Sequence, residues 1–219
     1  VKRTESNWPQ WLNAARRRPS QTSPALFHTE TRAEIERDYD RVLFSTPVRR
    51  MADKTQVFPL DHSDSVRTRL THSHEVANLA RSVGLDLVFN RNLAAGLPQA
   101  LRDVPALLAT IGLAHDLGNP PFGHQGEEAI GRWFARHEAT VLNPQTGLSE
   151  AMRQDFLRFE GNAQTLRLLT KLQLINDDYG LNLTVATLAA LIKYPVGSDD
   201  IDKKFVVRKK HGFFQSEQA

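Results

Sequence analysis

The stretch from Ile111 to Ile130 carries the side chains with the greatest potential for chemistry. It reads IGLAHDLGNPPFGHQGEEAI, so that His115 and Asp116 come before a double proline, Pro120 and Pro121. Imidazole and carboxylate groups bind divalent metals, and they also act as general acids and bases. Because proline cannot donate a backbone hydrogen bond, we expect one helix to end here and a sharp turn to follow. The pattern predicts metal ligands that face acid/base groups across a tight turn, which suits hydrolysis of a phosphate ester.

The acid/base groups are expected on the helix that follows the turn. His124 and Glu127 are three residues apart and share a predicted helix face with Phe134, whereas Glu128 lies on a more lateral line. We therefore expect Glu127, rather than Glu128, to point inward. The first turn of a helix also favours carboxylates and a nearby anion, because the backbone N–H groups there are unpaired.

A second histidine-bearing segment, RTRLTHSHEV at Arg67–Val76, is predicted to contribute to the same site. Helical steps of four, three, four and four residues lead from His72 to a set of apolar side chains. They are Val76, Leu79, Val83 and Leu87. His72 is therefore expected on a buried apolar face, and His74 about 200° away from it.

The same test on the next helix leads from Val104 through Leu108 and Ile111 to His115. A histidine on an apolar face is usually an ordinary core residue. Here two helices each place a histidine on a predicted buried face, and Asp116 directly follows one of them. This coincidence favours a metal site over the core interpretation.

The composition limits the other classes of protein. A chain of 219 residues with 40% hydrophobic and 24% charged residues is typical of a globular protein with one core, or two small ones. No apolar run approaches the roughly 20 residues of a membrane helix, and no signal peptide opens the chain, so we expect a cytoplasmic protein without a membrane partner. The chain has no cysteine, which leaves only imidazole and carboxylate as metal ligands.

Basic residues are clustered although the net charge is only +3. The clusters are Arg16–Arg18, Arg49–Arg50 and the Lys203–Lys210 region. Such clusters suit polyanions such as nucleotides or nucleic acid, and solvated surface charge is an equally open interpretation of each.

The hydrophobic periodicity predicts a mostly helical chain. Residues 1–30 are expected to form an irregular N-terminal arm that packs through Trp8 and Trp11 or docks on a partner subunit, and helices are expected from Thr31 onward. The expected interruptions are a turn at Ser45–Pro47, a loop over residues 138–150, a break at Gly161, and short extended pieces near residues 55–58 and 204–207.

These features resemble the HD-domain phosphohydrolases, and more closely the deoxyguanosine triphosphate triphosphohydrolase (dGTPase) family. The segments that carry the resemblance, in the family's order, are KTQVFPL (Lys54–Leu60), RTRLTHS (Arg67–Ser73), AHDLGNPPFGHQGE (Ala114–Glu127), RFEGNAQ (Arg158–Gln164) and LIKYP (Leu191–Pro195). The resemblance implies an all-α HD-domain helical bundle over residues 31–219, with a basic C-terminal segment.

The resemblance also implies a set of metal ligands. Three of them are His72, His115 and Asp116, and a fourth, an aspartate, comes from a later helix that this chain stops before. Other aspartates lie in expected turns and match no family motif; they are Asp177, Asp178, Asp199 and Asp200. We therefore expect the domain to continue beyond Ala219, and a metal that is one of Mn, Mg, Co, Ni, Fe or Zn.

The activity implied is hydrolysis of deoxynucleoside triphosphates (dNTPs) at the α-phosphorus, which gives a deoxynucleoside and inorganic triphosphate. His124, oriented by Glu127, resembles the family's acid/base pair and would protonate the leaving 5′-oxygen. The implied substrate contacts are Gln56 near the deoxyribose 3′-hydroxyl, Arg69 and Lys193 on the triphosphate, and Tyr194 on the sugar. The sequence does not indicate a base preference.

Two further hypotheses remain open. One is another HD phosphohydrolase, acting on nucleoside monophosphates or cyclic nucleotides, although the continuation GNPPFGHQGE argues against it. The other is a non-catalytic HD protein that binds nucleotide or single-stranded DNA as a regulator. The resemblance further implies a homo-oligomer, commonly a hexamer, and a nucleotide or single-stranded DNA effector.

Overall fold

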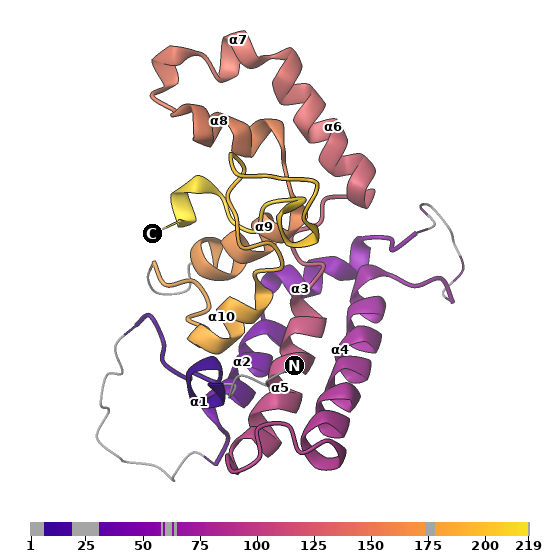
Figure 1. Cartoon of the computed structure of the whole chain (residues 1–219). Coiled ribbons are helices and arrows are strands. Elements are labelled where there is room, and N and C mark those ends of the chain that lie inside the picture. The colour runs from indigo at the N-terminus through magenta and orange to yellow at the C-terminus, as the bar shows by residue number, and fades with distance from the viewer. Residues whose placement is uncertain are drawn as a thin grey trace. The chain divides into compact units, whose positions relative to one another are not determined.

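The computed structural model describes residues 7–18, 31–57, 59, 63, 65–173 and 178–218 (Figure 1). These residues are organised by helices, and no β-strand is assigned among them; their only β-pairings are two isolated bridges, Arg16–Thr184 and Thr55–Thr68. The predicted all-α class is confirmed. No helix of the described residues is both long enough and apolar enough to cross a membrane.

The helices follow one another along the chain as labelled in Figure 1. They are α1 (Trp8–Trp11), α2 (Glu34–Leu43), α3 (Thr46–Arg50), α4 (Arg69–Leu85), α5 (Ala100–Ala114), α6 (Gly123–Arg136), α7 (Glu138–Val141), α8 (Glu150–Leu157), α9 (Gly161–Arg167) and α10 (Val185–Leu191). Two π-helical segments, Asp86–Asn90 and Leu168–Leu172, continue α4 and α9. The turn expected at Ser45–Pro47 is confirmed, since α2 ends at Leu43 and α3 begins at Thr46. The break expected at Gly161 is also confirmed, since α8 ends at Leu157 and α9 begins at Gly161.

The chain forms two compact units. Unit 1 comprises Val1–Val48, Ser73–Ala114 and Leu169–Leu191, and unit 2 comprises Arg49–His72, His115–Leu168 and Ile192–Ala219. The boundary predicted between an N-terminal arm and the following domain at residue 30 stays a prediction.

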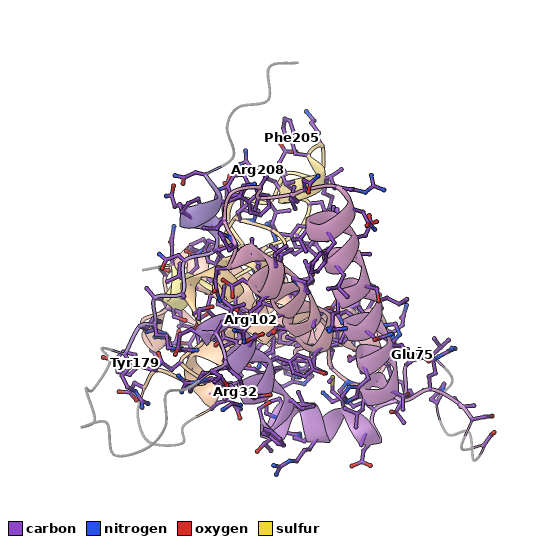
Figure 2. The ribbon with its side chains drawn as sticks, turned by 90° about the horizontal axis from the view of Figure 1, so that it is seen from below. Arg32, Glu75, Arg102, Tyr179, Phe205 and Arg208 are labelled. Atoms are coloured by element: carbon purple, nitrogen blue, oxygen red, sulfur yellow. The ribbon has the colours of Figure 1, made fainter. Side chains whose placement is uncertain are left out.

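The core of unit 1 is formed by α2, α5 and α10. Ile35 and Val104 are buried there, and the described part of the N-terminal arm joins them through Leu12 and Trp8. The arm therefore packs on its own chain through Trp8, whereas Trp11 is exposed. On the surface of this unit, ion pairs join Arg32 to Asp40 and Arg102 to Glu36; both arginines are labelled in Figure 2.

The predicted apolar face of α4 is wrong. Leu79 and Val83 are 66% and 55% exposed, and the buried positions of α4 are instead small residues such as Ala77 and Gly84. A Cβ atom added to Gly112 of α5 would lie only 2.7 Å from the Ala77 Cα atom. The two helices pack so closely that bulky side chains do not fit between them, and the small residues decide which face of α4 is buried.

In unit 2, α6 packs on α8, and the two helices lie side by side in Figure 1. The rings of Phe134 and Phe156 meet at a centroid distance of 5.0 Å. The double-proline turn is confirmed, since α5 ends at Ala114 and α6 begins at Gly123, after Phe122 with a left-handed φ of 65°. With this turn, α6 begins seven residues after Asp116 in the chain.

The loop predicted over residues 138–150 is wrong in part, because α7 forms at its beginning. Leu142 just after α7 is buried, and Glu138 forms an ion pair with Arg153 of α8; both interactions stabilise the extra turn. The extended piece expected near residues 204–207 is also wrong, since Val206–Arg208 is a 3₁₀ turn.

A buried carboxylate in unit 1 provides a test of this fold. Asp38 accepts hydrogen bonds from Arg16 Nη1 at 2.7 Å and from the Thr184 N–H at 2.8 Å, and its side chain is fully buried. We expect Asp38→Ala to lower the free energy of unfolding by about 3 kcal/mol, the low end for breaking a buried ion pair, because a second carboxylate still pairs with Arg16. Urea denaturation followed by circular dichroism measures the change. The control Asp40→Ala removes the exposed pair with Arg32 and should cost less than about 1 kcal/mol. An equal loss of unfolding free energy in the two variants would contradict the assignment of Asp38 as a buried partner of Arg16.

Candidate metal centre and acid/base pair

The three predicted metal ligands lie together in unit 2. One donor atom from each of His72, His115 and Asp116 lies within 4.8 Å of those of the other two. The two imidazole rings meet edge to face with their centroids 5.4 Å apart. Two imidazole nitrogens and one carboxylate oxygen suit a divalent transition metal, and a set of three protein ligands leaves a position for water or substrate. No fourth histidine, aspartate or glutamate joins this group within the described part of the chain.

Neither histidine lies on a fully buried face, contrary to the periodicity argument. His72 and His115 are both partly exposed, and only Asp116 is buried. His72 lies in the first turn of α4, and His115 follows the last residue of α5. The grouping of the three side chains is as predicted, but helix ends rather than buried helix faces position the two imidazoles.

Asp116 is held by two donors of unit 2. Asn119 Nδ2 donates to its Oδ1 atom at 2.6 Å, and Arg69 Nη1 donates to its Oδ2 atom at 2.9 Å. Lys54 Nζ donates in turn to the Asn119 carbonyl at 3.1 Å, and burial, together with the nearby Arg50 and Arg69, lowers the pKa of this ammonium group. Arg69, which the resemblance assigns to the triphosphate, is thus a buried partner of a predicted metal ligand, although its Nε atom has no hydrogen-bond partner.

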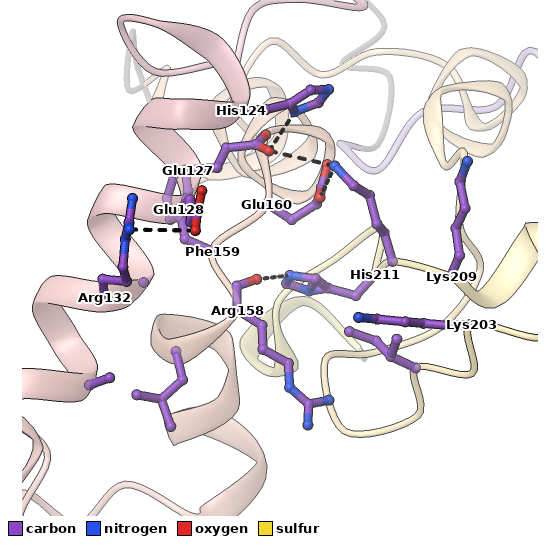
Figure 3. Close-up of a pocket in the computed structure, with 15 residues that line it drawn as sticks. His124, Glu127, Glu128, Arg132, Arg158, Phe159, Glu160, Lys203, Lys209 and His211 are labelled. Atoms are coloured by element: carbon purple, nitrogen blue, oxygen red, sulfur yellow. Dashed lines mark hydrogen bonds and ion pairs between the residues drawn. The ribbon is translucent and has the colours of Figure 1, made fainter.

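The predicted acid/base pair is formed in the structure. His124 Nδ1 lies 2.8 Å from Glu127 Oε2 (Figure 3). The other oxygen of Glu127 accepts a hydrogen bond from the Gly161 N–H at 2.8 Å. Glu127 is 8% exposed, while the His124 side chain is 82% exposed. Glu128 is exposed and lies 3.6 Å from Arg132, so the prediction that Glu127 rather than Glu128 points inward is confirmed.

The pKa of Glu127 is lowered despite the burial of its carboxyl group. Burial by itself would raise the pKa of this carboxyl group. The hydrogen bonds from His124 and Gly161 and the charge of Lys210 outweigh that effect and hold the pKa of Glu127 below its usual value. An ionised Glu127 can accept a hydrogen bond from the Nδ1–H of His124, which leaves the second ring nitrogen, Nε2, free of this contact.

The predicted substrate residues differ in accessibility. Gln56 has a buried side-chain oxygen, Oε1, without a hydrogen-bond partner, whereas Lys193 is exposed. Tyr194 is only 4% exposed, and its ring lies under the Lys193 ammonium at 5.6 Å from Nζ to the ring centroid. The roles of these three residues stay predictions, and the Tyr194 ring offers little free surface to a sugar.

A cavity of about 810 Å³ adjoins the His124–Glu127 pair in unit 2 (Figure 3). The three candidate metal ligands do not line it. Its basic side chains come from α6, from the residue that follows α8, and from the C-terminal segment: Arg132, Arg158, Lys203, Lys209, Lys210 and His211.

Sequence reasoning missed three residues of this region, namely Glu160, Lys210 and His211. Glu160 belongs to the FEGN motif and is buried as the N-cap residue of α9. Lys210 and His211 lie in a segment without helical periodicity, so no pattern could predict which of its side chains point inward. The cluster of basic residues was the only signal available, and it does not distinguish Lys210 from Lys209.

Comparison with known proteins agrees with this geometry. The HD domain family model matches residues 69–158, which include the three candidate ligands and the acid/base pair, so the chain contains an HD domain. Relatives named deoxyguanosinetriphosphate triphosphohydrolase-like protein are similar over most of the chain, and the resemblance predicted from the motifs is therefore confirmed. The relative from Listeria monocytogenes is 46% identical over 97% of this chain and 47% of its own length. Those from Synechocystis sp. and Pseudomonas aeruginosa are 42% and 43% identical, over 96% and 85% of this chain and 49% and 42% of their own lengths. The chain thus spans about half the length of the curated relatives it matches.

Metal titration tests the grouping of the three ligands. We expect His115→Ala to weaken Mn²⁺ binding to the intact protein by more than about 100-fold in isothermal titration calorimetry, because it removes a donor rather than a supporting contact. The matched control is His74→Ala, which removes an exposed histidine outside the group. Equal affinities of the two variants would rule out His115 as a ligand.

Proposed function

We propose that the chain forms part of a metal-dependent hydrolase that converts dNTPs into deoxynucleosides and inorganic triphosphate. The observation that carries this proposal is the presence, in one compact unit, of the His72–His115–Asp116 group and of a buried Glu127 hydrogen-bonded to His124. The HD-domain match and the names of the relatives support a phosphohydrolase, and the dNTP substrate and the site of cleavage are our proposal.

The donor set fits a divalent ion, as its nitrogen and oxygen atoms converge within 4.8 Å. His72, His115 and Asp116 would hold it, with Mn, Mg, Co, Ni, Fe and Zn as the candidates. Bound there, such an ion supplies Lewis-acid polarisation of a phosphate oxygen and lowers the pKa of water. Arg69 and Asn119 fix the orientation of the Asp116 carboxylate through hydrogen bonds. In many metal sites, residues that contact a ligand but not the metal have this role.

His124 and Glu127 carry the proton transfer in this proposal. Glu127 is fixed by the Gly161 N–H, and it orients the imidazole through Nδ1. Because the His124 side chain is largely exposed, its Nε2–H can reach the leaving 5′-oxygen of a bound nucleotide and protonate it. Cleavage of the bond between the α-phosphorus and the 5′-oxygen then releases a neutral alcohol instead of an alkoxide.

The other proposed contacts recognise the sugar and the phosphates. The unpartnered Gln56 Oε1 is a buried acceptor that a 3′-hydroxyl donor would satisfy. Lys193 is exposed and offers a cation to the triphosphate. Arg69 already donates to Asp116, so its remaining donors are the ones available to phosphate. A homo-hexamer and a nucleotide or single-stranded DNA effector are proposals that rest on the resemblance, and a cytoplasmic location is a proposal that rests on the composition.

The products of the reaction test the proposed activity. We expect the intact protein with Mn²⁺ to release inorganic triphosphate from dNTPs, as detected by ³¹P NMR. In H₂¹⁸O the label should enter the triphosphate, because water attacks phosphorus rather than the 5′-carbon. Release of pyrophosphate or orthophosphate would contradict the proposal. Binding of dNTP without turnover would favour the non-catalytic regulator.

A pair of adjacent glutamates tests the acid/base assignment. We expect Glu127→Gln to lower kcat by about 100-fold or more, because the neutral amide no longer stabilises a protonated His124. Manganese affinity should be retained, since Glu127 is not in the ligand group. The control Glu128→Gln changes an exposed residue and should keep kcat within about twofold of the wild type. Similar kcat values for the two variants would disprove the role of Glu127.

A further inference from the structure

Lys210 of the C-terminal segment reaches two buried carboxylates of unit 2. Its Nζ atom lies 2.6 Å from Glu160 Oε2 and 3.5 Å from Glu127 Oε2. The side chains of Glu160 and Glu127 are 5% and 9% exposed, whereas that of Lys210 keeps about a third of its surface. One ammonium group therefore serves two carboxylates that are almost fully removed from water.

Both carboxylates are otherwise held by the start of α9. Glu160 Oε1 accepts hydrogen bonds from the backbone N–H and the side-chain amide of Asn162, at 3.3 and 2.5 Å. The N–H of the residue between them, Gly161, donates to Glu127 Oε1. This short stretch supplies hydrogen-bond donors but no positive charge, and two buried carboxylates near each other oppose each other's ionisation. Lys210 provides the missing charge.

The neighbours of Lys210 fix its position although the segment is not helical. His211 is buried, and its Nε2 atom lies 2.9 Å from the Arg158 carbonyl oxygen. Gly212 follows, and a Cβ atom there would lie only 2.2 Å from the Tyr194 carbonyl oxygen. These contacts hold the backbone next to Lys210 against the carbonyl groups of Arg158 and Tyr194, so Lys210 does not reach its partners merely as a flexible surface side chain.

We propose that Lys210 is a positioning residue for the acid/base pair: it keeps Glu127 ionised and hydrogen-bonded to His124. This inference rests on the proposed function of that pair. The charged and titratable groups that face Glu127 are His124 from α6, Glu160 from the residue before α9, and Lys210 from the C-terminal segment. Of these, Lys210 is the permanent cation, because its contacts with Glu160 and Glu127 outweigh the opposite effect of burial and raise its pKa.

These charges determine the direction in which the pKa of Glu127 should change when Lys210 is removed. The pKa of Glu127 lies below its usual value, and Lys210 is one cause of this depression. Without Lys210 the pKa of Glu127 rises, so the carboxyl group takes up its proton at a higher pH and the pair with His124 is lost earlier on acidification. Activity that depends on the pair should therefore fall most at the acidic end of the pH profile and recover as the pH rises.

Direct titration of the Glu127 carboxyl group tests this inference without reference to activity. The intact protein is labelled with ¹³C-carboxyl glutamate, and the Glu127 resonance is assigned with Glu127→Gln. In Lys210→Met we expect the titration midpoint of the Glu127 carboxyl group to move to a higher pH. In Lys210→Arg this midpoint should remain near the wild-type value. The matched control is Lys209→Met, which removes an equal charge from the adjacent exposed position and should leave the midpoint unchanged. A folded Lys210→Met protein with the midpoint of Lys209→Met would overturn the proposal.

A second pair of variants guards against misfolding of Lys210→Met, which leaves the Glu160 carboxylate buried without its cation. Glu160→Gln removes that charge first, and Lys210→Met is then added in the same protein. The Glu127 midpoint should be higher in the double variant than in Glu160→Gln alone. Equal midpoints would overturn the proposal as well.

Kinetics separate this inference from the proposed function. With dNTP as substrate, Lys210→Met should lower kcat/KM by about 10- to 100-fold, as loss of an outer contact does at other sites, with the greatest loss at acidic pH and with recovery in Lys210→Arg. An equal loss at every pH would argue for a merely structural role. If the wild-type protein hydrolyses no dNTP, the proposed function fails, and the Glu127 titration still decides the role of Lys210.

Discussion

The burial of the Glu127 carboxylate is the constraint on which the organisation of unit 2 depends. A carboxylate removed from water is costly unless hydrogen-bond donors and a cation replace its hydration. Three separate parts of the chain supply them, namely His124 in α6, the Gly161 N–H at the start of α9, and Lys210 in the C-terminal segment. The contacts of the Glu127 carboxylate thus bring together segments that lie far apart in the sequence. They also help to fix the C-terminal segment, which forms no regular helix.

The same physical logic applies at the candidate metal group. Asp116 is buried and bound by Arg69 and Asn119, so its charge is balanced in the absence of an ion. Asp116 and Glu127 are therefore both oriented before any ligand arrives. Asp116 lies beside the imidazoles of His72 and His115, and Glu127 is hydrogen-bonded to the imidazole of His124. An arrangement that is fixed in advance loses less entropy when substrate binds, which is how preorganised sites accelerate reactions.

Much of the site could be predicted because it depends on local chemistry. The double proline predicted the end of α5 and the turn before α6, and helical spacing separated Glu127 from Glu128. The face of α4 could not be predicted from apolar residues, since a close approach at Ala77 and Gly112 buries the small side chains and leaves Leu79 exposed. His72 and His115 lie close together as predicted, but they do so because each lies at the end of a helix and not because they share a buried apolar face. Lys210 lay beyond prediction, because a segment without periodicity gives no indication of which residues face inward.

The most direct test of the account is a crystal structure of the intact protein with Mn²⁺ and a dNTP analogue whose 5′-oxygen is replaced by a methylene group. Anomalous scattering would locate the ion. We predict manganese bound by His72, His115 and Asp116, with the α-phosphate beside it and His124 Nε2 within hydrogen-bond distance of the position that the 5′-oxygen would occupy. An ion held by other residues, or an α-phosphate out of reach of His124, would contradict it.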